Sequence, residues 1–168
     1  DLILINHQSM LDIIVMEHLH SRNIAWVAKK EITDLFFFGH IIKAPRMISI
    51  NRENKAGLIH LLSEVKDRLS KGRPIAMFPE GTRSDGTYIG EVKAGAKMVG
   101  NKFNLKVQPV VMFNTRNIVN SQKMEASPGV VKVIYLKPVV ASKDTSWYED
   151  CEKNMKEVFE KEYKNYVS

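Results

Sequence analysis

The sequence contains a single cysteine, Cys151, so the chain can form no internal disulfide, and a reducing compartment is its simplest setting. No glycine-rich turn or neighbouring histidine would activate Cys151, so we expect a small, half-buried apolar residue and not a nucleophile. No apolar run reaches the length of a membrane-spanning helix, and no signal peptide is visible. Because strand-like residues begin at once after Asp1, we expect the natural protein to carry a further segment before them.

The composition is that of one globular domain. The 168 residues are of ordinary domain size, and the hydrophobic fraction of 44% is large enough for a core. The charged fraction of 26% argues against disorder. The net charge is +6, from 25 Lys and Arg against 19 Asp and Glu. This excess favours an anionic partner, whether a phosphate-bearing metabolite, an anionic membrane or a nucleic acid.

Apolar strands alternate with amphipathic helices along the chain. Strands are expected at residues 2–5, 24–28, 47–50, 74–78, 107–113 and 130–136, and helices at 9–20, 31–38, 54–71, 94–103 and 147–166. This order predicts a single-domain α/β fold in which helices flank a largely parallel or mixed central sheet. Pro109 lies within an apolar strand, so we expect an edge or a bulge there. Functional groups in such sheets gather at the carboxyl ends of the strands.

A histidine and an aspartate follow the first strand. His7 lies just before the expected helix, and Asp12 lies in its first turn, so the carboxylate can reach back to the imidazole. An imidazole held in this way could take the proton from a hydroxyl group that attacks a thioester. The residues alone leave open the alternative that Asp12 only caps the helix.

Basic residues follow the next three strands. Lys29 follows the second strand, Arg52 the third, and the turn Phe78–Ser84 the fourth. This turn offers backbone amides beside the donors of Thr82 and Arg83, which suits an anionic oxygen, and Arg83 can hold a phosphate through two parallel hydrogen bonds. Three converging cations would form an anion pocket. The alternatives are an ordinary polar turn and three unrelated surface cations.

Together these motifs closely resemble those of the 1-acyl-sn-glycerol-3-phosphate (lysophosphatidic acid) acyltransferase family, in the glycerophospholipid acyltransferase superfamily. That family shows, in order, Asn-His-x-x-x-x-Asp, a Lys-x-Glu-Leu-like element, a strand ending in Arg, Phe-Pro-Glu-Gly-Thr-Arg-Ser, and Val-x-Pro-Val. The matching residues are Asn6–Asp12, Lys29–Ile32, Arg52, Phe78–Ser84 and Val107–Val110, about two-thirds of the chain from first to last. Two features depart from the family: the residues before Arg52 lack its Gly and Phe-Ile-Asp, and no membrane-binding segment precedes the first motif.

The resemblance implies that residues 1–168 are an acyltransferase catalytic domain without its N-terminal membrane-binding segment. It implies transfer of a fatty acyl group from acyl-CoA or acyl-carrier protein to the free hydroxyl of 1-acyl-glycerol-3-phosphate, giving phosphatidic acid. His7 would be the general base, oriented by Asp12, with no metal and no cofactor besides the thioester co-substrate. The resemblance assigns acceptor binding to Lys29, Arg52, Glu80, Gly81 and Arg83, and Thr82 is a further donor of the same turn.

Both substrates are lipidic, so we expect the domain to meet a membrane surface, at the cytoplasmic face of the cell membrane. Residues 36–46 combine Phe36, Phe37 and Phe38 with nearby cations and are a candidate contact, unless the phenylalanines belong to the core. Nucleic acid is not expected, because no basic stripe is interleaved with aromatic residues. A metal site is not expected either. The helix would place His18 and His20 about 200° apart, with His18 half-buried and His20 exposed.

Other activities remain alternatives to this interpretation. Within the same enzyme class, the acceptor could be glycerol-3-phosphate or another lysophospholipid. A thioesterase would use His7 to activate water and would consume the acyl donor without an acceptor. A module that binds anionic lipid without catalysis would also suit the basic composition.

Overall fold

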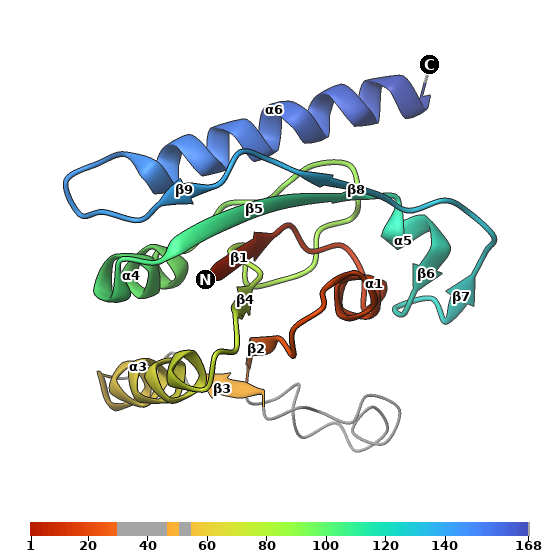
Figure 1. Cartoon of the computed structure of the whole chain (residues 1–168). Coiled ribbons are helices and arrows are strands. Elements are labelled where there is room, and N and C mark those ends of the chain that lie inside the picture. The colour runs from red at the N-terminus through yellow and green to blue at the C-terminus, as the bar shows by residue number, and fades with distance from the viewer. Residues whose placement is uncertain (30–46, 51–54, 168) are drawn as a thin grey trace.

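The computed structural model describes residues 1–29, 47–50 and 55–167. The expected helix at residues 31–38, the candidate membrane contact at 36–46 and Arg52 lie outside the described residues. The strands are β1 (Leu2–Ile5), β2 (Ala25–Lys29), β3 (Ile48–Ile50), β4 (Ile75–Met77), β5 (Lys106–Phe113), β6 (Val119–Asn120), β7 (Glu125–Ala126), β8 (Lys132–Tyr135) and β9 (Val139–Val140). The helices are α1 (Leu11–Leu19), α3 (Lys55–Ser70), α4 (Ala94–Phe103), α5 (Thr115–Ile118) and α6 (Trp147–Val167) (Figure 1).

The main sheet is mixed, with β1 at its centre. In the part of the chain that is described it has seven strands, in the order β3-β2-β4-β1-β5-β8, and β9 also pairs with β5. The pairs from β3 to β5 are parallel, while β8 and β9 run antiparallel to β5. The predicted α/β fold with a mixed central sheet is therefore confirmed. The carboxyl ends of β2, β4 and β1 meet at one edge, which is where the predicted site residues follow their strands.

Both faces of the central strand are buried, as its unbroken apolar sequence predicts. Alternate side chains point to opposite faces, so Leu2 and Leu4 join a core with residues of α3, α4 and α6. Ile3 and Ile5 join a second core, together with Met16 of α1. Figure 1 shows α3 and α4 on one side of the strands and α1 on the other. The strand that leads to His7 is thus fixed from both sides.

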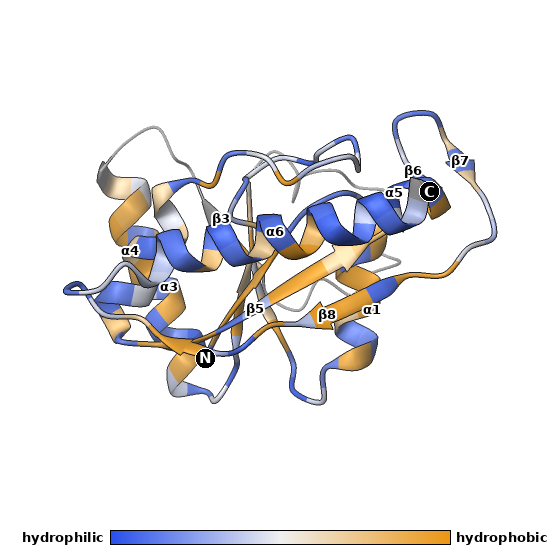
Figure 2. Ribbon diagram, turned by 90° about the horizontal axis from the view of Figure 1, so that it is seen from above, coloured by the Kyte–Doolittle hydropathy of each residue, from blue (hydrophilic) through white to orange (hydrophobic). Residues whose placement is uncertain are grey.

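Helix α6 closes the first core. The helix lies across β5 and β8, and its apolar stripe of Trp147, Cys151, Met155 and Phe159 is buried. The side that faces away from the strands is largely hydrophilic (Figure 2). Burial raises the pKa of the Cys151 thiol to about 11. Little thiolate therefore forms at neutral pH, and the structure agrees with an inert core residue in place of a nucleophile.

Pro109 lies where the pairing along β5 is interrupted. One segment of β5, Val110–Phe113, pairs with β8, and the segment Lys106–Val107 pairs with β9. Between them, the side-chain amide of Gln108 donates to the carbonyl of Leu136 at 2.7 Å, and the backbone N–H of Leu136 donates to the carbonyl of Pro109 at 3.0 Å. The expected irregularity at the proline is present, and it leaves the other edge of β5 free to pair with β1.

Candidate active site

The fold brings His7 and Asp12 together. The Nδ1 atom of His7 lies 2.9 Å from Oδ2 of Asp12, whose side chain is fully buried. The ring of His7 also stacks on that of Phe78, with centroids 3.8 Å apart and planes 13° from parallel. Phe78 in turn stacks on Trp26. The imidazole is therefore fixed by a carboxylate at its edge and by an aromatic ring at its face.

The carboxylate of Asp12 joins the loop after β1 to the imidazole. Its Oδ2 atom accepts the backbone N–H of Gln8 at 2.7 Å and that of Ser9 at 2.9 Å, besides the ring of His7. Helix α1 begins at Leu11, and just before it the N–H of Leu11 donates to Oγ of Ser9 at 3.3 Å while the N–H of Ser9 donates to Asp12. Asp12 therefore caps the start of the helix and also holds His7. Because the carboxylate only accepts, Nδ1 carries the proton and Nε2 is left as the basic nitrogen.

Asn6 fixes the end of the same strand. Its side-chain amide donates to the carbonyl of Met112 at 2.9 Å, and its Oδ1 accepts the backbone N–H of Met112 at 2.7 Å. The two bonds extend the pairing of β1 with β5 beyond the last backbone ladder. The motif residue beside His7 is thus structural, holding the end of β1 against β5.

The turn after β4 is hydrogen-bonded to both the N–H and the carbonyl of His7. Glu80 is buried, and its Oε1 accepts the N–H of His7 while its Oε2 accepts the N–H of Gly90, both at 2.7 Å. The N–H of Ser84 donates to the carbonyl of His7 at 2.8 Å. Gly81 has φ +70°, a left-handed conformation that favours glycine, where the turn reverses. The structure gives Glu80 a positioning role; its predicted contact with the substrate stays a prediction.

Burial sets the ionisation of Glu80. It raises the pKa of this carboxyl above the ordinary value, and the hydrogen bonds from the amides of His7 and Gly90 oppose the shift only in part. The nearby charge of Asp12 acts in the same direction as burial. Burial of the Glu80 carboxyl group therefore costs free energy. Because both of its oxygens accept backbone N–H groups, we infer that the carboxyl is needed to hold the backbone of His7 and Gly90 in place.

Glu80→Gln should lower the free energy of unfolding by about 1–3 kcal/mol, because the amide NH₂ cannot accept one of the two backbone N–H groups, whereas a carboxyl group retains acceptor capacity in both protonation states. The loss should also depend on pH. Because the pKa of Glu80 is raised in the folded state, the wild-type protein loses stability as the pH rises from the ordinary pKa of 4.5 through the folded-state pKa. The variant has no carboxyl group at this position and lacks this dependence of stability on pH. The difference between the two proteins should therefore shrink over that interval. Urea unfolding from pH 4 to pH 8 measures this difference.

The control is Glu91→Gln, at a highly exposed position nearby. Identical stabilities for Glu80→Gln and wild type would contradict the positioning role of Glu80.

The predicted cations are placed to different degrees. Arg83 is half-buried, and its Nη1 donates to Oγ of Ser121 in the turn between β6 and β7 at 2.5 Å. Thr82 is exposed beside it. Lys29 ends β2, with its backbone in register with Ile50, but its side chain lies outside the described residues, as does all of Arg52. The structure therefore binds the side chain of Arg83 to the turn between β6 and β7, while the convergence of the three cations stays a prediction.

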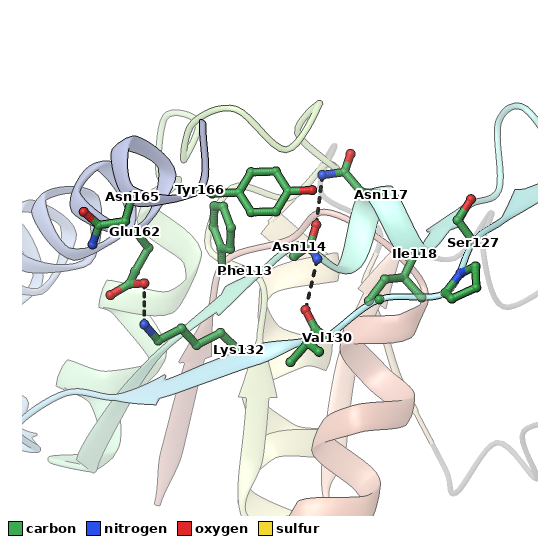
Figure 3. Close-up of a pocket in the computed structure, with 12 residues that line it drawn as sticks. Phe113, Asn114, Asn117, Ile118, Ser127, Val130, Lys132, Glu162, Asn165 and Tyr166 are labelled. Carbon is green, nitrogen blue, oxygen red and sulfur yellow. Dashed lines mark hydrogen bonds and ion pairs between the residues drawn. The ribbon is translucent and has the colours of Figure 1, made fainter. Parts of the chain in front are cut away.

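A separate hollow of about 700 Å³ lies near the carboxyl end of β5, between α5, residues 127–132 and the end of α6 (Figure 3). Its polar groups are largely paired with one another. Lys132 forms an ion pair with Glu162, and the side-chain amide of Asn114 donates to the carbonyl of Val130 at 3.0 Å. None of the described candidate site residues lines this hollow. It borders the same short helix, α5, that touches the His7 site.

Two further properties concern metals and membranes. Within residues 1–29, 47–50 and 55–167, no group of three or more His, Cys, Asp or Glu side chains is placed to hold a metal ion. Over the same residues, no helix combines the length and the apolar character needed to cross a bilayer. The predicted burial of the two histidines at the end of α1 is wrong. His18 is exposed and His20 is half-buried, because α1 ends at Leu19 and Nδ1 of His20 accepts the N–H of Arg22.

A histidine held by a buried carboxylate, beside a turn that bears Thr82 and Arg83, suits the transfer of an acyl group to a hydroxyl. The sequence model of the Acyltransferase family matches residues 2–113, and the chain belongs to this family. The predicted family is thereby confirmed.

Individual relatives are more specific. The 1-acyl-sn-glycerol-3-phosphate acyltransferase of Helicobacter pylori (strain J99) is 41% identical over 167 residues, which cover 96% of this chain and 69% of the relative. That of Salmonella typhimurium (strain LT2) is 32% identical, covering 82% of this chain and 56% of the relative. The crystal structure of the 1-acyl-sn-glycerophosphate (LPA) acyltransferase PlsC from Thermotoga maritima matches with a TM-score of 0.74 and 25% identity, covering 99% of this chain and 66% of PlsC. The chain thus spans between 56% and 69% of the length of these proteins.

Proposed function

We propose that the protein transfers a fatty acyl group from acyl-CoA or acyl-carrier protein to the free hydroxyl of 1-acyl-glycerol-3-phosphate, giving phosphatidic acid. The observation that carries this proposal is the 2.9 Å contact between Nδ1 of His7 and Oδ2 of Asp12. It leaves Nε2 as a base at the end of β1, next to the turn that bears Arg83. The names of the relatives support the choice of acceptor.

The chemistry needs no covalent enzyme intermediate. The acceptor hydroxyl attacks the thioester carbonyl carbon while its proton passes to Nε2 of His7. Asp12 stabilises the imidazolium that forms and holds the ring in one tautomer. Collapse of the tetrahedral intermediate breaks the carbon–sulfur bond, and the departing thiolate takes the proton from the imidazolium. The products are the new ester and a free thiol, with His7 neutral again.

Arg83 is proposed to bind the acceptor phosphate, together with Thr82 and Gly81 of the same turn. Arg83 directly precedes Ser84, whose N–H donates to the carbonyl of His7, and its guanidinium can offer two parallel hydrogen bonds to one phosphate. Lys29 and Arg52 are proposed to complete the anion site from the neighbouring strand ends. We further propose that the acceptor is taken from a membrane surface at the cytoplasmic face, because a lysophospholipid partitions into lipid.

Side-by-side assays test the proposed reaction. The full-length natural protein is supplied with a labelled acyl thioester, as the CoA ester or on carrier protein, and with lysophosphatidic acid, glycerol-3-phosphate or lysophosphatidylcholine. The highest kcat/KM is expected with lysophosphatidic acid. A preference for either other acceptor would overturn the acceptor choice. Release of thiol at the same rate without acceptor would instead indicate a thioesterase, and binding to anionic vesicles without transfer would indicate a lipid-binding module.

Arg83→Ala should mainly raise the KM for the acceptor, by roughly 10-fold, because a charged hydrogen bond to phosphate is lost while the base is untouched. Initial rates over a range of lysophosphatidic acid concentrations separate KM from kcat. Arg22→Ala is the matched control, since Arg22 pairs with Asp1 at the exposed N-terminal side of the sheet. An unchanged acceptor KM in Arg83→Ala would remove Arg83 from the proposed binding site.

A further inference from the structure

We propose that Thr115 is a positioning residue for acyl transfer, acting through Asp12 on His7. The inference rests on the proposed function. Thr115 is the first residue of α5 and is fully buried, although it carries a hydroxyl group. That hydroxyl donates to Oδ1 of Asp12, the oxygen that faces away from the imidazole. Thr115 lies outside the sequence motifs that predict the site, 103 residues from Asp12 along the chain.

The hydrogen bonds to Asp12 are divided unequally between its two oxygens. Oδ2 accepts from the ring of His7 and from two backbone amides, whereas Thr115 is the donor to Oδ1 within the described part of the chain. The terminal torsion of an aspartate is soft, and rotation about it turns the plane of the carboxylate and moves both oxygens together. A donor on the opposite oxygen fixes that plane. The direction from Oδ2 to Nδ1 of His7 then becomes fixed too.

The amide of Gln8 completes this arrangement. Gln8 is fully buried, its Oε1 lies 3.1 Å from Oγ1 of Thr115, and its Nε2 has no hydrogen-bond partner in the described structure. The single hydroxyl proton of Thr115 cannot serve both Gln8 and Asp12. Turning the Gln8 amide over lets its NH₂ group donate to Thr115, and the hydroxyl proton then goes to Asp12. This orientation satisfies Thr115 as both donor and acceptor.

Contacts at both ends hold α5 in the place that this geometry requires. A helix of four residues has no stability of its own, so tertiary contacts must fix it. At its start, the side chain of Asn114 donates to the carbonyl of Val130 at 3.0 Å. At its end, the hydroxyl of Ser9, in the His7 loop itself, donates to the carbonyl of Val119 at 2.6 Å. Thr115 is therefore carried to Asp12 by a segment anchored on the loop that it positions.

The test compares Thr115→Val with Thr115→Ser in the full-length protein. The valine keeps the shape and removes the hydroxyl, so Oδ1 of Asp12 loses its donor. We expect kcat with lysophosphatidic acid to fall roughly 5- to 10-fold, with the KM of both substrates unchanged. The serine keeps the hydroxyl and should restore most of kcat. In proton NMR, the ring N–H that His7 shares with Asp12 should shift in the valine variant and stay in place in the serine variant.

Controls separate positioning from folding and from the function itself. Thr145→Val removes a hydroxyl that bonds a backbone carbonyl on the exposed segment before α6, and it should leave every readout unchanged. If Thr115→Val does not fold, Thr115→Ala takes its place with the same readouts. Wild-type kcat without the hydroxyl, or equal losses in the valine and serine variants, would overturn the proposal. His7→Ala, assayed in parallel, separates a failure of the positioning role from a failure of the proposed function. An inactive His7→Ala beside a fully active Thr115→Val would overturn the role of Thr115 and leave the proposed function standing.

Discussion

His7→Ala is expected to lower kcat for acyl transfer at least about 100-fold, the effect of removing a positioned general base. The acceptor hydroxyl then has only water to take its proton, although both substrates can still bind. The measurement is the turnover of a labelled acyl thioester at saturating lysophosphatidic acid. KM should change little, because the base contributes to the transition state more than to the ground state.

The control for this variant is His60→Ala. His60 is exposed on α3, in a different part of the molecule, and its loss should leave turnover unchanged. Because His7 also stacks on Phe78, the folded state of His7→Ala must be checked by its thermal unfolding. A folded His7→Ala protein with near-normal turnover would remove the mechanism proposed above.

The long elements were predictable because their sequence periodicity is carried by many residues. Residues 94–103 form α4 with the predicted bounds, and the stripe predicted for residues 147–166 is the buried side of α6. The strands β6, β7 and β9, of two residues each, and the four-residue α5 have too few residues for any period to show. They exist because long-range contacts hold them. The burial of His18 and His20 was predicted in reverse, since it depends on where α1 ends.

The candidate site divides in the same way. The contact of His7 with Asp12 spans five residues and could be expected from a strand followed directly by a helix. The contact of Asp12 with Thr115 spans 103 residues, and only the pairing of β1 with β5 brings it about. The hydrogen bonds that Glu80 accepts from the amides of His7 and Gly90 likewise depend on β4 lying next to β1. The sequence therefore indicated that His7 and Asp12 lie together, and the sheet order supplies the residues that hold this pair.

Asp12→Asn should lower kcat roughly 10- to 100-fold, less than His7→Ala. The structure gives a reason why this variant isolates the charge. An asparagine oxygen placed where Oδ2 lies still accepts from the ring of His7 and from the two backbone amides, so the tautomer is kept. Its NH₂ group faces Oγ1 of Thr115, which can accept from it. The Gln8 amide can then turn its oxygen toward Thr115, 3.1 Å away, and accept the hydroxyl proton. Only the negative charge that stabilises the imidazolium is lost.

The double variant makes this prediction sharper. Asp12 is proposed to act only through the imidazole, so His7→Ala combined with Asp12→Asn should be no slower than His7→Ala alone. Asp144→Asn, at an exposed position before α6, is the control for the loss of a carboxylate and should leave kcat unchanged. Losses that multiply in the double variant would mean that Asp12 assists the reaction without His7. In that case the 2.9 Å contact between the two side chains would not be the unit that performs the proton transfer.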